Sequence, residues 1–145
     1  MPLVRELSAG YLTNQMARLF ARSIDWRLAP LGLSSGYLPV FFALADGVAR
    51  PQKELARLAS VEQPTMTATL NRMERDGLIV RATDPGDRRS ALVRLSPAAR
   101  RKLEDVQQAV DDTNAEGLAR LSAAERAQLL TLMRKVIGAL EAPLA

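Results

Sequence analysis

The sequence has no cysteine and no histidine among its 145 residues. Without cysteine the chain can form no disulfide framework, thiol nucleophile, zinc finger or iron–sulfur cluster. Without histidine it has no serine–histidine–aspartate triad, no histidine metal ligand and no imidazole base. A glycine-rich phosphate loop is missing as well. We therefore expect a protein that is not an enzyme and has no catalytic residue, no metal site and no cofactor.

Long apolar runs are also missing. The longest are far shorter than the roughly 18 residues that indicate a membrane span. The first ten residues lack the basic segment and the apolar run of a secretory signal. We therefore expect no membrane partner and a cytoplasmic location. The length fits a single domain over residues 1–145, because domains typically have about 100–150 residues.

Positive charge is concentrated in the middle of the chain. Residues 47–102 carry twelve Lys and Arg against six acidic residues, whereas residues 1–46 carry four against three and residues 103–145 carry four against seven. A basic central segment is typical of a protein that binds a polyanion, nucleic acid above all. The alternative from charge alone is a solvated basic surface.

Apolar spacing and helix-breaking residues divide the chain into elements. Apolar residues three and four apart predict a helix over residues 8–28. An apolar run of helix-forming residues predicts a second helix over residues 38–45. Pro51 and Pro64 each open a further short helix, and Gly77 ends the second of these. Two short helices joined by a brief break fit a helix-turn-helix.

A hairpin is expected directly after this motif. Branched side chains in residues 78–82 and 91–95 predict two strands, joined by a polar loop over residues 83–90 with Pro-Gly at its centre. A hairpin in this place is a wing. Arg88 and Arg89 are expected at its exposed turn, where guanidinium groups can enter the negative minor groove of DNA.

Two carboxylates accompany these arginines. Asp84 and Asp87 would repel DNA unless they were paired, so we expect them to orient the arginines by bidentate contacts. The alternative is a surface ion-pair cluster that contributes little.

Two more helices complete the chain. Ser96-Pro97 opens the first, and the capping box Ser122-x-x-Glu125 opens the second, which Pro143 ends. The first and last helices of the chain have apolar faces too wide for one small domain to cover. We therefore expect a second copy of the chain to cover them in a homodimer.

The helix expected from Pro64 to Arg75 has two different sides. At about 100° per residue, one side gathers Met66, Thr69, Leu70 and Met73 and packs, while the other gathers hydroxyl, amide and guanidinium groups. Asn can pair with adenine, Arg with guanine, and Thr with a phosphate or the thymine methyl. The alternative is an ordinary amphipathic helix. The polar side holds Pro64, Ala68, Asn71, Arg72 and Arg75, with Thr65 and Thr67 on its flanks.

Four segments carry a family resemblance: PQKELA at residues 51–56, TLNRMERDGLI at 69–79, DPGDRRS at 84–90 and VRLS at 93–96. Together they resemble the MarR family of bacterial transcription regulators. The resemblance implies a mainly α fold with a small β-hairpin, built as a homodimeric winged helix-turn-helix. Residues 34–96 would form the DNA-binding lobe, and residues 1–33 and 97–145 the dimerisation helices.

The resemblance also implies a function and its residues. The dimer would bind double-stranded DNA at a pseudo-palindromic operator, with recognition helices in successive major grooves and wings in the minor grooves. Arg89 matches the wing-tip arginine and Asp87 the acid that braces the wing. The positions that match the base- and phosphate-facing residues of the family are Gln63, Thr65, Thr67, Asn71 and Arg72.

Many members of the family release DNA when a small, often aromatic, anion binds, which implies a ligand-released repressor. Around the break between the first two helices we expect an effector site made by Arg22, Trp26, Tyr37 and Phe41. The alternative is that the three aromatic residues are simply core. Members that sense oxidants do so through cysteine, and this chain departs from them because it has none.

A second function class stays open beside the DNA-binding regulator. A winged-helix module could bind protein and use its basic wing as a docking surface. Salt-sensitive binding to duplex DNA distinguishes the two.

Overall fold

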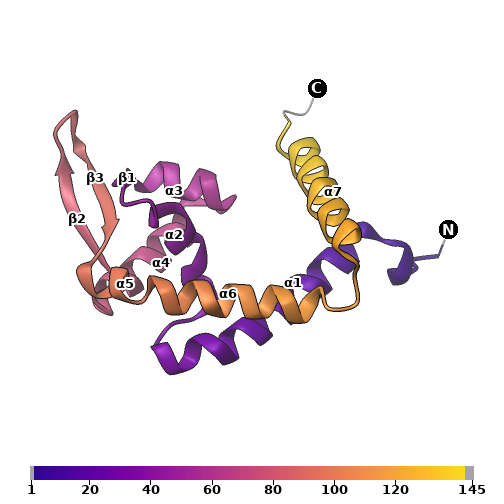
Figure 1. Cartoon of the computed structure of the whole chain (residues 1–145). Coiled ribbons are helices and arrows are strands. Elements are labelled where there is room, and N and C mark those ends of the chain that lie inside the picture. Colours follow the sequence, from indigo (N-terminus) through magenta and orange to yellow (C-terminus); the bar gives the residue numbers. More distant parts are fainter. Residues whose placement is uncertain (1, 143–145) are drawn as a thin grey trace. The chain divides into compact units, whose positions relative to one another are not determined.

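The fold is mainly α-helical with one small antiparallel sheet, as the sequence predicts. A computed structural model describes residues 2–142, so Pro143, the expected end of the last helix, lies outside the described residues. In the part of the chain described, no helix has the length and apolar character to cross a membrane. The elements, drawn in Figure 1, are α1 (Ala9–Leu28), α2 (Leu38–Leu44), β1 (Arg50–Pro51), α3 (Gln52–Ala59), α4 (Gln63–Arg75), β2 (Ile79–Asp84), β3 (Asp87–Leu95), α5 (Pro97–Arg101), α6 (Leu103–Gly117) and α7 (Ala123–Glu141).

The chain divides into two compact units, residues 1–110 and residues 111–145, with the division inside α6. The first unit contains the helix-turn-helix α3–α4 and the β2–β3 hairpin, which extends beyond the helices as a two-stranded arm (Figure 1). The second unit contains the end of α6 and all of α7. The grouping of residues 1–33 with residues 97–145 as dimerisation helices stays a prediction.

The helix ends have local caps, of which the Ser122 capping box and Gly77 were predicted from the sequence. The Ser8 hydroxyl accepts the backbone N–H of Tyr11 and caps α1. Ser122 and Glu125 form the complete capping box of α7, each side chain accepting the other residue's backbone N–H. Gly77 follows α4 with φ of 74°, a left-handed conformation that glycine adopts without a Cβ clash.

The sheet is larger than predicted. Pro51 is not the first helical residue but the N-cap of α3, with extended dihedral angles. Arg50 and Pro51 form a short edge strand that pairs with Val93 and Leu92, so the strand order is β1-β3-β2. Proline is tolerated here because an edge strand does not need every N–H for the ladder.

The predicted single helix from Pro97 is interrupted. It divides into α5 and α6 at Lys102, whose ammonium group donates to the carbonyl of Leu31 at 2.6 Å. This contact fixes the chain immediately before Gly32, which has φ of 72°. The break therefore coincides with a tie between α5 and the segment that leads into α2.

The apolar side of α4 forms part of the core, as predicted. Met66, Leu70 and Met73 are buried, and Val93 of β3 is buried in the same cluster. The Ser96 hydroxyl donates to the carbonyl of Gly77 at 2.6 Å and accepts the N–H of Ala99. The end of α4, the base of the hairpin and the start of α5 are thus held together by one buried serine.

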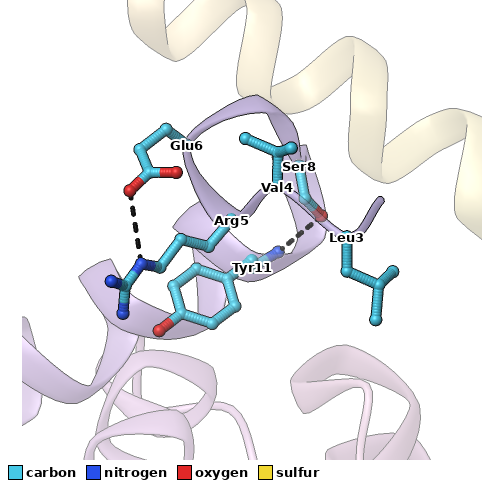
Figure 2. A pocket seen from close by; sticks show the side chains of 6 residues that line it. All are labelled: Leu3, Val4, Arg5, Glu6, Ser8 and Tyr11. Carbon is cyan, nitrogen blue, oxygen red and sulfur yellow. Dashed lines mark hydrogen bonds and ion pairs between the residues drawn. The ribbon is translucent and has the colours of Figure 1, made fainter. Parts of the chain in front are cut away.

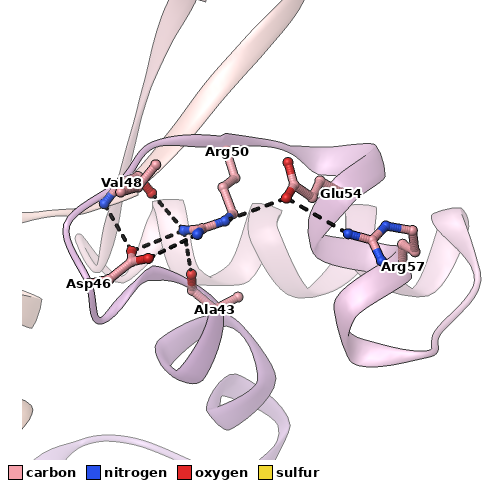
Figure 3. Close-up of polar contacts among 6 residues, drawn as sticks. All are labelled: Ala43, Asp46, Val48, Arg50, Glu54 and Arg57. Atoms are coloured by element: carbon pink, nitrogen blue, oxygen red, sulfur yellow. Dashed lines mark hydrogen bonds and ion pairs between the residues drawn. The ribbon is translucent and has the colours of Figure 1, made fainter.

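A second tie joins the end of α2 to α3 (Figure 3). The Arg50 guanidinium donates to both carboxylate oxygens of Asp46, at 3.0 and 2.9 Å, and to the carbonyl of Ala43 at 2.8 Å. Its Nε lies 3.6 Å from the Glu54 carboxylate. The paired charges hold the turn between α2 and β1 in one geometry.

Asp46→Asn is expected to make the lobe less sensitive to acid. The bond from Arg50, followed by that from the Val48 N–H, lowers the pKa of Asp46 from 3.8 to about 2. Because the pKa of Asp46 is lower in the folded than in the unfolded state, its carboxylate stabilises the folded lobe in full above about pH 4. This stabilisation is lost as the pH falls through about 2. Thermal unfolding midpoints of the two proteins should therefore differ near neutral pH and converge below about pH 2. An equal difference at every pH would contradict this assignment.

Candidate nucleic-acid interface

The polar side of α4 is exposed. It lies opposite the buried Met66, Leu70 and Met73. Because the apolar side packs into the core, the polar groups face solvent. The helix begins at Gln63 after Glu62, with Pro64 in its first turn. The five residues predicted to face DNA on this helix are all exposed: Gln63, Thr65, Thr67, Asn71 and Arg72.

Two of these side chains are tied to α3. The Gln52 amide nitrogen donates to the hydroxyl oxygen of Thr67 and to the side-chain oxygen of Gln63. The Thr67 hydroxyl in turn donates to the Gln63 carbonyl at 3.0 Å. A hydroxyl has one proton to donate, so Thr67 can donate to a phosphate only by breaking this bond.

A third side chain is tied to the wing. Arg81 of β2 donates through Nη2 to the side-chain oxygen of Asn71 at 3.1 Å. Its Nε lies 3.5 Å from the carboxylate of Glu74. Arg81 therefore bridges the hairpin and the exposed side of α4.

The tip of the wing is tighter than predicted. Asp84 of β2 is the strand partner of Asp87 of β3. The turn between the strands therefore consists of Pro85 and Gly86 and not of the whole of residues 83–90. The Asp84 carboxylate accepts the N–H of Gly86 at 2.8 Å, which closes the turn early. Arg88 and Arg89 consequently lie on β3 itself.

The prediction that the wing carboxylates orient Arg88 and Arg89 by bidentate contacts is wrong. The Asp87 carboxylate accepts the backbone N–H of Arg89 at 3.0 Å, and Asp84 binds the turn as described above. Within residues 2–142, neither carboxylate pairs with the guanidinium of Arg88 or Arg89. The acids stabilise the backbone, and both guanidinium groups are exposed for another partner.

A groove of about 280 Å³ separates the wing from the start of α3. Three cationic side chains line it, one from α3 and one from each long strand, which suits a phosphate backbone. Gln52, Lys53 and Arg81 were not singled out from the sequence. The available signal was the position of Gln52 and Lys53 immediately after a helix-opening proline. The lining residues are Pro51, Gln52, Lys53, Gln63, Arg81, Arg89, Ser90, Ala91 and Val93.

Among the cavities described for residues 2–142, none is lined by all four of the residues expected to bind an effector. Tyr37 and Phe41 are buried in the core, whereas Arg22 is exposed and Trp26 is 78% exposed. The Tyr37 hydroxyl donates to the Asp76 carboxylate at 2.7 Å, and this bond, together with burial, raises the pKa of Tyr37. Phe41 lines a cavity of about 50 Å³ between α2 and the start of α6, without the other three. Release by an aromatic anion stays a prediction.

Comparison with known proteins gives consistent matches. A model described as "MarR family" matches residues 31–90. A probable transcriptional regulator from Pseudomonas aeruginosa is 30% identical, with a TM-score of 0.82 over 90% of this chain and 98% of that one. A mutant of MarR from E. coli, solved with operator DNA, is 27% identical, with a TM-score of 0.84 over 94% and 99%.

A further structure shares the fold at lower identity. BpsR from Bordetella bronchiseptica, described for the regulation of its DNA binding by 6-hydroxynicotinic acid, is 22% identical, with a TM-score of 0.85 over 99% of this chain and 100% of that one.

Proposed function

The chain belongs to the MarR family of transcription regulators, and from this premise we propose that it binds a pseudo-palindromic DNA operator as a homodimer and acts as a repressor. The observation that carries the proposal is the exposed polar side of α4 beside a wing in which Arg88 and Arg89 have no acidic partner among the described residues. The recognition helix would enter the major groove and the wing the minor groove. The family consists of transcription regulators, so the proposal includes no catalysis.

Exposed apolar surface in each unit supports the homodimer. In the first unit, an open hollow of about 590 Å³ at the N-terminus is lined by Leu3, Val4 and Tyr11 among others (Figure 2), and Leu12, Met16 and Leu19 follow exposed along α1. In the second unit, α7 has no buried residue although much of it is apolar. Such surfaces are typical of an obligate interface between copies of one chain.

The protein-docking alternative uses the same wing. It predicts no dependence on DNA sequence, whereas the polar groups along α4 are those that read base edges in the major groove. The proposal therefore requires that substitutions on α4 change the affinity by different amounts for duplexes that differ at single base pairs.

Arg72→Ala is expected to reduce discrimination at one base pair in each half-site. Arg72 is exposed on α4, and an arginine that binds a guanine edge contributes about 1–3 kcal/mol of discrimination. Binding of the purified variant to a set of duplexes that differ at single positions measures this. Arg101→Ala, which removes an exposed charge from α5, is the matched control. An equal loss on every duplex would make Arg72 a phosphate contact.

A further inference from the structure

The contact between the wing and α4 concerns a side chain expected to read a base. We propose that Arg81 is a positioning residue that fixes the orientation of Asn71, so that Asn71 presents its amide nitrogen to DNA as a hydrogen-bond donor. This inference rests on the proposed function. It adds to the expectation from the sequence, in which Asn71 can pair with adenine.

The first step is the chemistry of the contact. A guanidinium group has five N–H donors and no acceptor, so it can bond only to the oxygen of a carboxamide. Arg81 Nη2 lies 3.1 Å from the Asn71 oxygen, within hydrogen-bond range. The contact therefore distinguishes the two orientations of the amide, which have nearly the same shape.

The second step is the rigidity of the guanidinium. Arg81 is held at both ends: its backbone pairs with Val93 of the sheet, and its Nε lies 3.5 Å from the Glu74 carboxylate. Asn71 and Glu74 are three residues apart on α4 and so lie on one face. A planar group that contacts two side chains of one helix face, one by a hydrogen bond and one by an ion pair, is restrained in its orientation, and the Arg81 side chain is 30% exposed.

The third step is what remains for DNA. The two-bond pair with adenine needs the Asn oxygen to accept from the base and the nitrogen to donate to it. Here one of the two lone pairs of the oxygen already accepts from Arg81, so the amide nitrogen is the group with its full capacity left for DNA. Its partners in the major groove are acceptors: O6 and N7 of guanine, N7 of adenine and O4 of thymine.

A different role for Arg81 must be separated from this one. Arg81 also lines the groove with Lys53 and Arg89, where it could bind a phosphate. A lost phosphate contact weakens binding to every sequence alike and reduces the salt slope by about one per contact. A lost positioning contact changes the base preference at one position and acts only through Asn71.

The experiment is selection of bound duplexes from a random-sequence library. It uses the full chain as wild type, Arg81→Met, Asn71→Ala, the double variant and Arg94→Met. Arg94 is an exposed arginine of β3 opposite Val80, so its loss controls for charge on the same sheet. Arg81→Met should lower discrimination at one base pair per half-site by roughly fivefold to tenfold. In the Asn71→Ala background it should change nothing at that position, and Arg94→Met should leave the preference intact.

Three results would overturn the proposal or its premise. An unchanged preference in Arg81→Met, or the same change with and without Asn71, would overturn the positioning role while the proposed function stands. Failure of the wild type to enrich any sequence would contradict the proposed function itself. Arg81→Thr, which suits a strand, repeats the test if Arg81→Met lowers the thermal midpoint, and the same results decide it.

Discussion

Ile137→Asp is expected to abolish both the dimer and binding to DNA. Ile137 lies on α7 and is 51% exposed, with Met133 and Leu140 exposed near it on the same side. If a second chain covers this side, an aspartate there buries an unpaired carboxylate in an apolar interface, which costs several kcal/mol. Because obligate dimers often have no stable folded monomer, helical content should fall as well.

Sedimentation at micromolar concentration and circular dichroism measure both effects. The wild type should sediment at twice its chain mass of 15.8 kDa. Gln128→Asp is the matched control, since nine residues at about 100° each place Gln128 on the opposite side of α7 from Ile137. A wild-type monomer, or an Ile137→Asp dimer of unchanged helical content, would contradict the dimer assignment.

Arg88→Ala combined with Arg89→Ala is expected to give the largest loss of affinity for DNA among variants that still fold. Both side chains are exposed on β3, and within residues 2–142 neither forms an ion pair with the wing carboxylates, so the double substitution removes no such pair. Because the double substitution removes two arginines from each chain, a dimer of the variant has four fewer positive charges. If all four bind phosphates or the minor groove, the slope of log K against log salt falls in magnitude by about 3 to 4.

Binding to one duplex at several salt concentrations gives this slope. The control variant Arg101→Ala with Arg120→Ala removes the same charge from exposed positions on α5 and after α6. If the control lowered the slope as much as the wing variant, only net charge would matter. If the wing variant kept the wild-type slope, the hairpin would be structural.

Much of the fold was predictable because its signals are local. Ser8 and Ser122 act on N–H groups three residues ahead, and Gly77 takes the left-handed conformation at its own position. The buried side of α4 follows from helical spacing alone. These features depend on neighbours within one turn of the chain, and such neighbours are visible in a sequence.

The remaining features depend on contacts between distant residues. The strand at Arg50 exists only because β3 lies beside it, and sequence spacing does not indicate that pairing. Gln52 bonds to Thr67, and Arg81 to Asn71, across separate elements. Exposed positions on α4 could be predicted, but which of their polar groups are already bonded could not.

The expected effector site shows the same limit. Residues near one helix break were grouped by position along the chain, yet Tyr37 and Phe41 turn into the core while Trp26 is exposed. Two of the four are therefore used for packing in this chain.

Selection of duplex DNA by the purified wild-type protein tests the central claim most directly. We expect an enriched pseudo-palindrome whose half-sites are about one helical turn apart, because a two-fold dimer presents two copies of α4 and of the wing. Affinity for that duplex should fall steeply as salt rises. A library that stays random after repeated selection, or binding that is insensitive to salt, would contradict the assignment of α4 and the wing to DNA.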